Sequence, residues 1–304
     1  MELPLFTRLG DGVSIEPGPV NATVRQWQLT ETLRQLREKA GLTMDQAVDI
    51  LQGLGGKWSK SKISRIENRE QGVKSFDVER LLTAYGVTDE AVRIQILDLA
   101  AKPAERGHWL ALRRDLPEQF HNLFDIEPAL QAVRQLETVV VPGLLQTTDY
   151  IRALITGANP GLSHDVLERR ILARTVRQSV LTRPDPLRYH VVLDESILER
   201  RIGSPEVMRG QVGRLIDAAQ EKHITIQILA KDTGATPAVN GPFSVLSLPD
   251  PIPDFGYTEG PGGSIYIEDR DVVRMCLERW GILTQRALSP ERSLDLLSEV
   301  GKTS

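Results

Sequence analysis

The densest group of side chains able to bind an anion lies between positions 57 and 74. This segment holds six basic residues against two acidic ones: Lys57, Lys60, Lys62, Arg65, Arg69 and Lys74 against Glu67 and Glu70. Lysine and arginine can neutralise phosphates, and the serines between them can donate hydrogen bonds to phosphates or base edges. The segment therefore has enough positive charge to contact a polyanion. On charge alone, a solvated helix face explains it equally well.

The apolar residues of the segment decide which way its cations point. Ile63 and Ile66 share one face of a helix, which must meet the core, and Ser59 is the candidate N-cap. The outward face then carries Ser61, Ser64, Arg65 and Asn68, with Lys60 in the first turn and Lys62 at its flank. Short donors and long cations on one outward face suit the DNA major groove, with the flanking residues on phosphates.

Four further helices are expected around this one. Their starts are Thr30 for "TETLRQLREKAG", Thr43 for "MDQAVDILQGL", Ser75 for "FDVERLLTAYG" and Thr88 for "DEAVRIQILDLAAK". Gly41 is a stop signal for the first of them, and the last stops before Pro103. Short helices in close succession predict a compact all-α domain over residues 28–102, preceded by an N-terminal tail over residues 1–27.

The combined stretch "LRQLREKAGLT…SKSKISRIENRE" resembles the helix-turn-helix domain of the phage repressor and Cro type, the XRE family, over about residues 28–100. The resemblance implies double-stranded DNA as a partner. It implies base reading by Lys60, Ser61 and Arg65, and phosphate contacts by Asn68 and by Thr43 or Met44. With the outward face, the expected DNA-binding set is Thr43, Met44, Lys60, Ser61, Lys62, Ser64, Arg65 and Asn68.

The same resemblance implies a structural salt bridge. Arg37, just before the Gly-Leu-Thr turn, should pair with Glu67 at the end of the recognition helix. One feature departs from the family pattern, because Thr43 and Ser59 lie farther apart than usual. The surplus residues fall in "ILQGLGGKWS", which holds three glycines. Either the second helix is longer or the turn is an enlarged loop.

Residues 103–304 indicate an α/β or α+β domain. Strands are expected at "RYHVVLDE", "ITIQIL", "PFSVLSLP", "FGYTE" and "SIYIE". Helices are expected over residues 164–182, "SPEVMRGQVGRLIDAAQEK", "DRDVVRMCLERWGILTQRAL" and "SPERSLDLLSEV". The stretch "VVVPGLLQT" reads as a β-branched run and a Pro-Gly turn leading to the helix "TDYIRALI".

Several stretches of this half, "VVVPGLLQTTDYIRALI", "VLTRPDP", "VVLDESIL" and "NGPFSVLSLPDP", are similar to the C-terminal domain of an actinobacterial regulator family that includes WhiJ-like developmental regulators. The resemblance implies regulation through a partner, a small acidic protein or a small ligand. Two places are candidates for contacting it: Gln146 and Thr147 in the turn, and Arg183 and Arg188 around "RPDPLR". A plain strand-to-helix connection and a solvated loop remain open alternatives.

Charge and composition narrow the function classes. The chain carries a net charge of −4, and residues 1–102 are balanced at 14 basic and 14 acidic residues, so the acidic excess belongs to the C-terminal part. That part should not itself hold DNA. One cysteine, no signal peptide and no long apolar run favour a cytoplasmic protein without a membrane span. We find no metal-ligand spacing, cofactor motif or catalytic constellation, and expect no enzyme.

The sequence thus predicts a sequence-specific transcriptional regulator with a DNA-binding domain and a C-terminal regulatory domain. A single recognition helix reads only a few base pairs, so we expect a homodimer held mainly by the C-terminal domain. Two alternatives stay open. One is a DNA-binding antitoxin whose C-terminal domain neutralises a small partner protein, and the other is an enzyme targeted to DNA.

Overall fold

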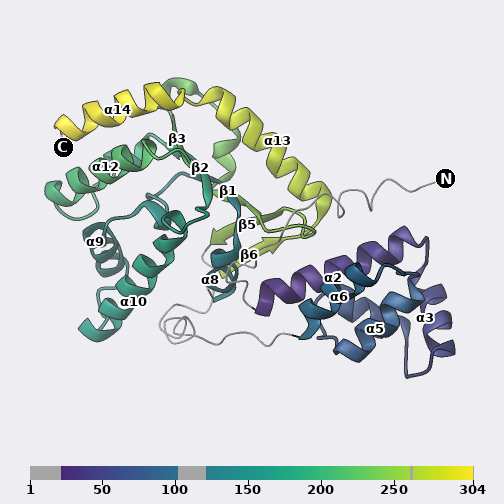
Figure 1. The fold of residues 1–304 in the computed structure, drawn as a ribbon. Helices are drawn as coiled ribbons and strands as arrows, with labels where there is room; N and C mark the ends of the chain where they lie inside the picture. The colour runs from purple at the N-terminus through teal and green to yellow at the C-terminus, as the bar shows by residue number, and fades with distance from the viewer. Residues whose placement is uncertain (1–21, 102–120, 261–262, 304) are drawn as a thin grey trace.

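The computed structural model describes residues 22–101, 121–260 and 263–303. An all-helical N-terminal region is followed by a domain built on a mixed β-sheet, which confirms the expected fold class (Figure 1). The predicted domain boundary at residues 102 and 103 lies outside the described residues. The N-terminal helices are α2 (Ala22–Lys39), α3 (Met44–Gly53), α4 (Lys60–Glu67), α5 (Ser75–Ala84) and α6 (Glu90–Ala101).

The N-terminal helices pack around one core. Its buried members include Leu33 of α2, Leu51 of α3, Ile63 and Ile66 of α4 and Leu81 of α5. The predicted helix starts hold at Thr43 and Ser59, whose side chains accept hydrogen bonds from backbone N–H groups of the first turn. Helix α5 begins at Ser75, as predicted, with Lys74 as its N-cap. Helix α6 begins slightly later than predicted, at Glu90, and the side chain of Asp89 accepts from its first turn.

Helix α2 is longer than the sequence predicts. It begins at Ala22 rather than Thr30, so the predicted tail over residues 1–27 is wrong for residues 22–27. Residues 1–21 of that tail lie outside the described part of the chain. The physical reason is tertiary: Val24 is buried in the core of the C-terminal domain, and Trp27 packs against it. The first turns of α2 therefore belong to one domain and its last turns to the other.

The C-terminal domain is organised by a six-stranded sheet within the described residues, in the order β3-β2-β1-β4-β5-β6. Strands β1, β2 and β3 are parallel, whereas β4, β5 and β6 continue the sheet antiparallel on the other side of β1. The strand bounds are β1 (Ala132–Glu137), β2 (Arg188–Asp194), β3 (Ile224–Leu229), β4 (Phe243–Ser247), β5 (Phe255–Gly260) and β6 (Gly263–Ile267).

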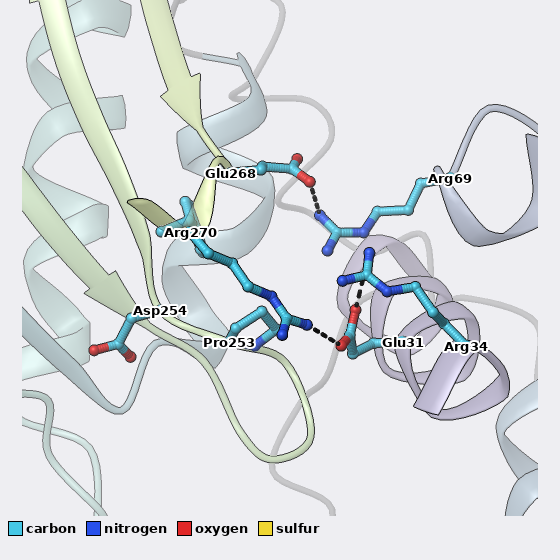
Figure 2. Close-up of a pocket in the computed structure, with 8 residues that line it drawn as sticks. Glu31, Arg34, Arg69, Pro253, Asp254, Glu268 and Arg270 are labelled. Carbon is cyan, nitrogen blue, oxygen red and sulfur yellow. Dashed lines mark ion pairs between the residues drawn. The ribbon is translucent and has the colours of Figure 1, made fainter. Parts of the chain in front are cut away.

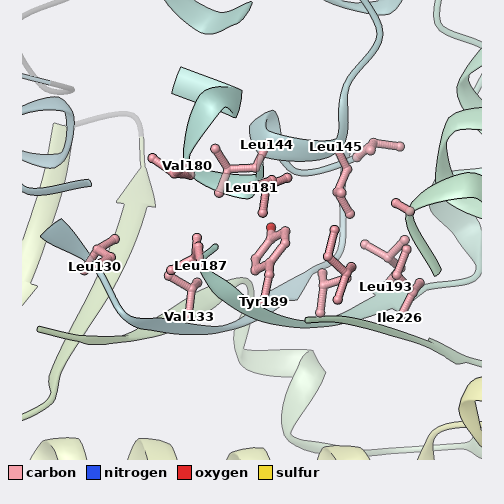
Figure 3. Packing of buried hydrophobic residues seen from close by; sticks show 14 of the residues in the cluster. Leu130, Val133, Leu144, Leu145, Val180, Leu181, Leu187, Tyr189, Leu193 and Ile226 are labelled. Carbon is pink, nitrogen blue, oxygen red and sulfur yellow. The ribbon is translucent and has the colours of Figure 1, made fainter. Parts of the chain in front are cut away.

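Alternating residues of the strands face two different layers. On one face, Val133, Tyr189 and Ile226 join a large apolar core together with residues of the covering helices and short 3-10 turns, including Leu144 and Val180 (Figure 3). On the other face, Leu136 and Val192 pack with Trp280 and Leu283 of α13. The helices of this domain are α8 (His121–Ile126), α9 (Thr148–Ala158), α10 (His164–Arg177), α11 (Ser196–Glu199), α12 (Pro205–Ala219), α13 (Arg270–Arg286) and α14 (Pro290–Thr303).

One strand lies earlier than the sequence indicates. The β-branched run at residues 139–141 is irregular, and strand β1 covers the preceding residues Ala132–Glu137. Val139 is 47% exposed, so the run of valines does not form a buried strand. Strand β1 carries Arg134 and Gln135 at its centre, and its place between β2 and β4 depends on pairing that no local pattern reveals.

Candidate nucleic-acid interface

Helix α4 presents its polar face to the outside because its apolar residues are fixed in the core. Ile63 and Ile66 are 1% and 2% exposed. The Ser59 hydroxyl accepts a hydrogen bond from the Lys62 backbone N–H at 3.2 Å, which satisfies one of the free donors at the helix start. The opposite face is open: Lys60, Ser61, Arg65 and Asn68 are exposed, and Ser64 is half-buried.

The exposed side chains of α4 are held only by weak local contacts. Arg65 Nε donates to the Ser61 carbonyl at 3.3 Å, and Asn68 Nδ2 donates to the Ser64 hydroxyl at 3.2 Å. Lys60 Nζ lies 2.8 Å from Asp45 Oδ2, and both side chains are more than half exposed. An exposed ion pair contributes little to stability. These groups can therefore exchange their present partners for phosphates or base edges at small cost.

Two residues of the expected DNA-binding set are used inside the domain instead. Lys62 Nζ lies 2.9 Å from Asp77 Oδ2 and 3.8 Å from the ring centre of the buried Trp58, so its charge ties α4 to α5. Met44 is half-buried and packs against the domain core. Thr43 is exposed, although its hydroxyl already caps α3 by accepting from the Gln46 N–H at 3.2 Å.

The enlarged connection between α3 and α4 is a structured turn, not a longer helix. Helix α3 ends at Gly53, and the chain then turns through Gly55 and Gly56, whose φ angles are 87° and 104°. Trp58 fills the space beneath the turn and is 4% exposed. Its carbonyl accepts a hydrogen bond from Gln52 Nε2 at 3.2 Å. The surplus residues therefore position α4 through a buried indole.

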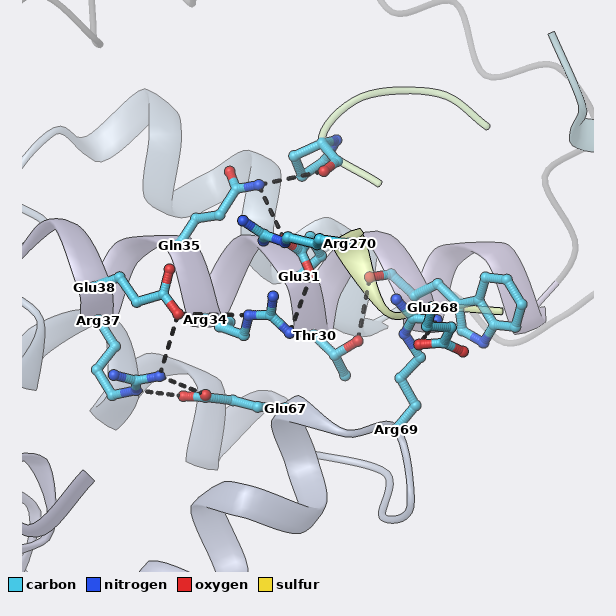
Figure 4. A network of polar contacts seen from close by, with 12 residues as sticks. Thr30, Glu31, Arg34, Gln35, Arg37, Glu38, Glu67, Arg69, Glu268 and Arg270 are labelled. Carbon is cyan, nitrogen blue, oxygen red and sulfur yellow. Dashed lines mark hydrogen bonds and ion pairs between the residues drawn. The ribbon is translucent and has the colours of Figure 1, made fainter. Parts of the chain in front are cut away.

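Arg37 and Glu67, the pair implied by the family resemblance, meet between α2 and α4. Arg37 Nε and Nη2 each lie 2.7 Å from a different Glu67 oxygen, which makes the contact bidentate (Figure 4). Both side chains are nearly fully buried. Hydrogen bonding to Glu67 raises the pKa of Arg37, and burial, followed by the charge of Glu67, raises the pKa of Tyr85 next to the pair. The pair locks the end of α4 onto α2.

Helix α4 is also tied to the C-terminal domain. Arg69, just after α4, lies 3.0 Å from Glu268 and stacks on the ring of Trp27, with 4.6 Å between the guanidinium carbon and the ring centre. Across the same junction Arg270 Nη2 is 3.6 Å from Glu31 Oε1 (Figure 2). Glu31 is only 2% exposed, and Arg34 contacts it as well. The two domains therefore meet in a set of alternating charges next to the C-terminal end of α4.

Sequence reasoning missed this junction. Its residues come from α2, from the turn after α4 and from the residues that follow β6, so no local spacing joins them. Within this junction Arg69 has a positive φ of 67°, a backbone conformation that a non-glycine residue adopts only when its surroundings fix it.

The four residues expected to contact a partner are mostly structural. Gln146 is 3% exposed and donates to the Val141 carbonyl at 2.6 Å, so it does not project from the turn. Thr147 is the N-cap of α9. Arg183 donates to the carbonyls of Pro128 and Leu130 and holds the loop against the domain. Only Arg188, at the start of β2, is exposed.

The described residues contain no cluster of histidine, cysteine, aspartate and glutamate suited to a metal ion. None of the described helices is long and apolar enough to cross a membrane.

Comparison with known protein families divides the chain in the same way as the geometry. A family model described as a helix-turn-helix domain matches residues 28–93. A second model, described as a domain of unknown function, DUF5753, matches residues 120–299. No curated protein and no solved structure matches the chain. The helix-turn-helix match covers α3, α4 and the outward polar face of α4.

Proposed function

The chain belongs to the family of the domain of unknown function DUF5753 and joins that domain to a helix-turn-helix domain, and on this premise we propose that it is a sequence-specific transcriptional regulator of the XRE type. The observation that carries the proposal is the outward face of α4. Lys60, Ser61, Arg65 and Asn68 stand exposed on a helix whose other face is fixed in the core. Such a helix can enter the major groove, with Arg65 placed to read a guanine edge.

The C-terminal domain supplies the regulation in this proposal. We infer that it forms the homodimer contacts and senses a small ligand or a small acidic partner protein, as in WhiJ-like actinobacterial regulators, and that it has no catalytic role. The charged junction between the domains supports this inference. Glu268 and Arg270 form ion pairs with Arg69 and Glu31, so a movement of the first two residues changes the contacts of the other two. A protein acting on chromosomal DNA in this way works in the cytoplasm.

Selection of bound fragments from genomic DNA by the full-length protein tests the proposal. We expect fragments that share one sequence with two related half-sites. The variant Arg65→Ala should bind the recovered sequence more weakly and tolerate changes at one base pair of each half-site. Arg274→Ala, which removes the same charge from an exposed position of α13, is the matched control and should behave as wild type. Recovery of fragments without any common sequence would contradict the proposal.

A further inference from the structure

We propose that the C-terminal domain binds a small organic anion with an apolar body of aromatic-ring size, in a cavity between the sheet and α10. The inference deepens the proposed regulatory function and rests on it, since it names the site and the ligand class through which regulation acts. The cavity has a volume of about 140 Å³. An apolar protein cavity of about 150 Å³ holds one benzene molecule, so the ligand is limited to about that size plus a polar group.

The cavity lies against one face of the sheet, around strand β1. Its floor includes Gln135 and Glu137 of β1, Ser244 of β4 and Tyr257 of β5, and its cover includes Arg174 of α10 and Gln146. Glu137 is the last residue of β1. The chain runs outward from β1 to β2 and β3 and then returns to β4 on the other side of β1.

Most acidic groups around the cavity are already neutralised. Glu127 makes a bidentate ion pair with Arg177, with distances of 2.6 and 2.8 Å. Glu137 accepts a hydrogen bond from Gln135 Nε2 at 2.7 Å, and burial raises the pKa of Glu137 to about 8. Its carboxyl group is therefore mainly protonated at neutral pH and can donate a hydrogen bond. Glu259, at the exposed rim, accepts from the Tyr257 hydroxyl at 2.7 Å.

Arg174 remains as a cation that lacks a close counter-ion. Its only hydrogen bond within the described residues is a long one, from Nη1 to Gln146 Oε1 at 3.3 Å, and no described carboxylate lies within ion-pair distance. Burial, followed by the positive charge of Arg177, lowers the pKa of Arg174 to about 10, and the negative charge of Glu259 at the rim acts in the opposite direction. Arg174 is half-buried, and a cation that has lost part of its hydration is stabilised by a paired anion. A carboxylate entering the cavity would supply that pair, and the side chains of Leu144 and Leu154 would receive its apolar body.

A row of aromatic contacts leads from this cavity to the DNA-binding domain. The ring centres are 5.1 Å apart for Tyr257 and Tyr266, 5.9 Å for Tyr266 and Phe255, and 5.7 Å for Phe255 and Trp27. Trp27 in turn stacks with Arg69, just after α4. Since Tyr257 lines the cavity, an anion bound there can shift this row and so change operator affinity.

Three isosteric probes test the ligand class. Benzoate, benzamide and benzamidine differ in charge, at −1, 0 and +1, but hardly in shape. In calorimetric titrations of the full-length protein at pH 7, we expect benzoate to bind at least tenfold more tightly than benzamide, and benzamidine to show no binding. Arg174→Gln should lose the preference for benzoate, whereas Arg209→Gln, an exposed control on α12, should keep it. Equal binding of all three probes, or no binding of benzoate, would overturn the proposal.

A second variant keeps the test decisive if Arg174→Gln fails to fold. Glu137→Gln retains a hydrogen-bond donor but cannot ionise. Wild-type affinity for benzoate should fall between pH 7 and pH 9 as Glu137 loses its proton, and the affinity of Glu137→Gln should stay constant. The other charged or titratable groups around Glu137 are Tyr150, Tyr189, Tyr257, Glu259, Glu127, Arg174 and Arg177, and they are the same in both proteins. Identical pH profiles would contradict the assigned site.

Measurements of operator affinity distinguish a failure of the proposed ligand site from a failure of the proposed regulatory function. Benzoate binding is measured without DNA, and operator affinity is then measured with and without benzoate. Coupling between the two is reciprocal, and we expect a change of roughly 5- to 150-fold in operator affinity. Intact operator binding without any benzoate binding would overturn the cavity proposal alone. Benzoate binding by a protein that does not distinguish operator from random DNA would overturn the proposed regulatory function but would still support the ligand site in the cavity.

Discussion

At the scale of single residues, the N-terminal domain uses its charges in two distinct ways. Arg37 and Glu67 are buried and bidentate, so their charges fix the position of α4 and are not available to a ligand. Lys60 and Asp45 form an ion pair of similar length at the surface, 2.8 Å, where water and salt weaken it. Burial, not distance, therefore separates the structural cation Arg37 from Lys60, the cation that we propose contacts DNA.

Removal of one partner of the buried pair should be far more costly than removal of one partner of the exposed pair. Arg37→Ala leaves the Glu67 carboxylate buried and unpaired, and we expect it to lower the free energy of unfolding by about 3–5 kcal/mol. Asp45→Ala should change it by less than about 1 kcal/mol. Urea denaturation of both variants gives the comparison, and similar losses for the two would show that the buried pair does not hold α4 in place.

Glu137 makes stability depend on pH in a direction that can be stated in advance. Its pKa is raised from 4.5 to about 8, chiefly by burial, so the folded protein binds a proton that the unfolded chain has released. The stability contributed by this proton is present at low pH and is lost as the pH rises toward 8. Glu137→Gln should therefore stabilise the protein relative to wild type at pH 8, on the order of a few kcal/mol, and much less at pH 5. Thermal unfolding at both pH values measures this, and an equal effect at the two would contradict it.

At the scale of secondary-structure elements, the turn between α3 and α4 determines how the DNA-binding helix is presented. A Cβ atom at Gly56 would lie 2.4 Å from Arg80 Nη1 and 3.2 Å from Trp58 Nε1. The residue also has a φ of 104°, which side chains disfavour. Gly53, at the end of α3, has neither constraint, since nothing lies within 4 Å of an added Cβ there. The two glycines form a matched pair for experiment.

Gly56→Ala should destabilise the N-terminal domain by about 1–3 kcal/mol and weaken operator binding, because strain at the turn displaces Trp58 and α4 together. Gly53→Ala should be neutral or slightly stabilising, because alanine is the better helix former. Thermal unfolding and a binding titration for each variant check the prediction. Equal behaviour of the two variants would mean that the turn does not position α4.

The elements that the sequence predicted well are those with local causes. Ser59 as a cap and Ile63 with Ile66 on one face were enough to place α4 and its outward side, and the continuous apolar run of β2 was enough to place that strand. Strand β1 was missed because its pairing with β2 and β4 is non-local. The cavity was missed for the same reason, since Glu137, Tyr257 and Arg174 meet only after the sheet has formed and α10 has packed on it.

At the scale of the whole molecule, α2 connects the two domains because it packs into the cores of both. Its first turns place Val24 and Trp27 against the C-terminal domain, and its later turns carry Leu33 and Arg37 into the DNA-binding domain. Gln28 and Gln35 add hydrogen bonds to the carbonyls of Asp250 and Pro251. A change in the C-terminal domain can therefore reach α4 through a rigid helix as well as through Arg69.

A protein of this kind should act as a homodimer, because one copy of α4 contacts too few base pairs for tight specific binding. We expect the C-terminal domain to provide most of the dimer contacts. Light scattering on the full-length protein at micromolar concentration should give twice the mass of the chain, which is 33.9 kDa. The mass of a single chain under these conditions would count against the dimer.

We propose that the outward face of α4 reads a DNA sequence. Competition between the recovered operator and a shuffled duplex of equal length and composition, at one fixed salt concentration, tests it most directly. We predict that the wild-type protein prefers the operator by about 1,000-fold or more, and that Arg65→Ala reduces this ratio by roughly 5- to 150-fold. Equal affinity of the wild-type protein for the two duplexes would show that α4 does not read a DNA sequence.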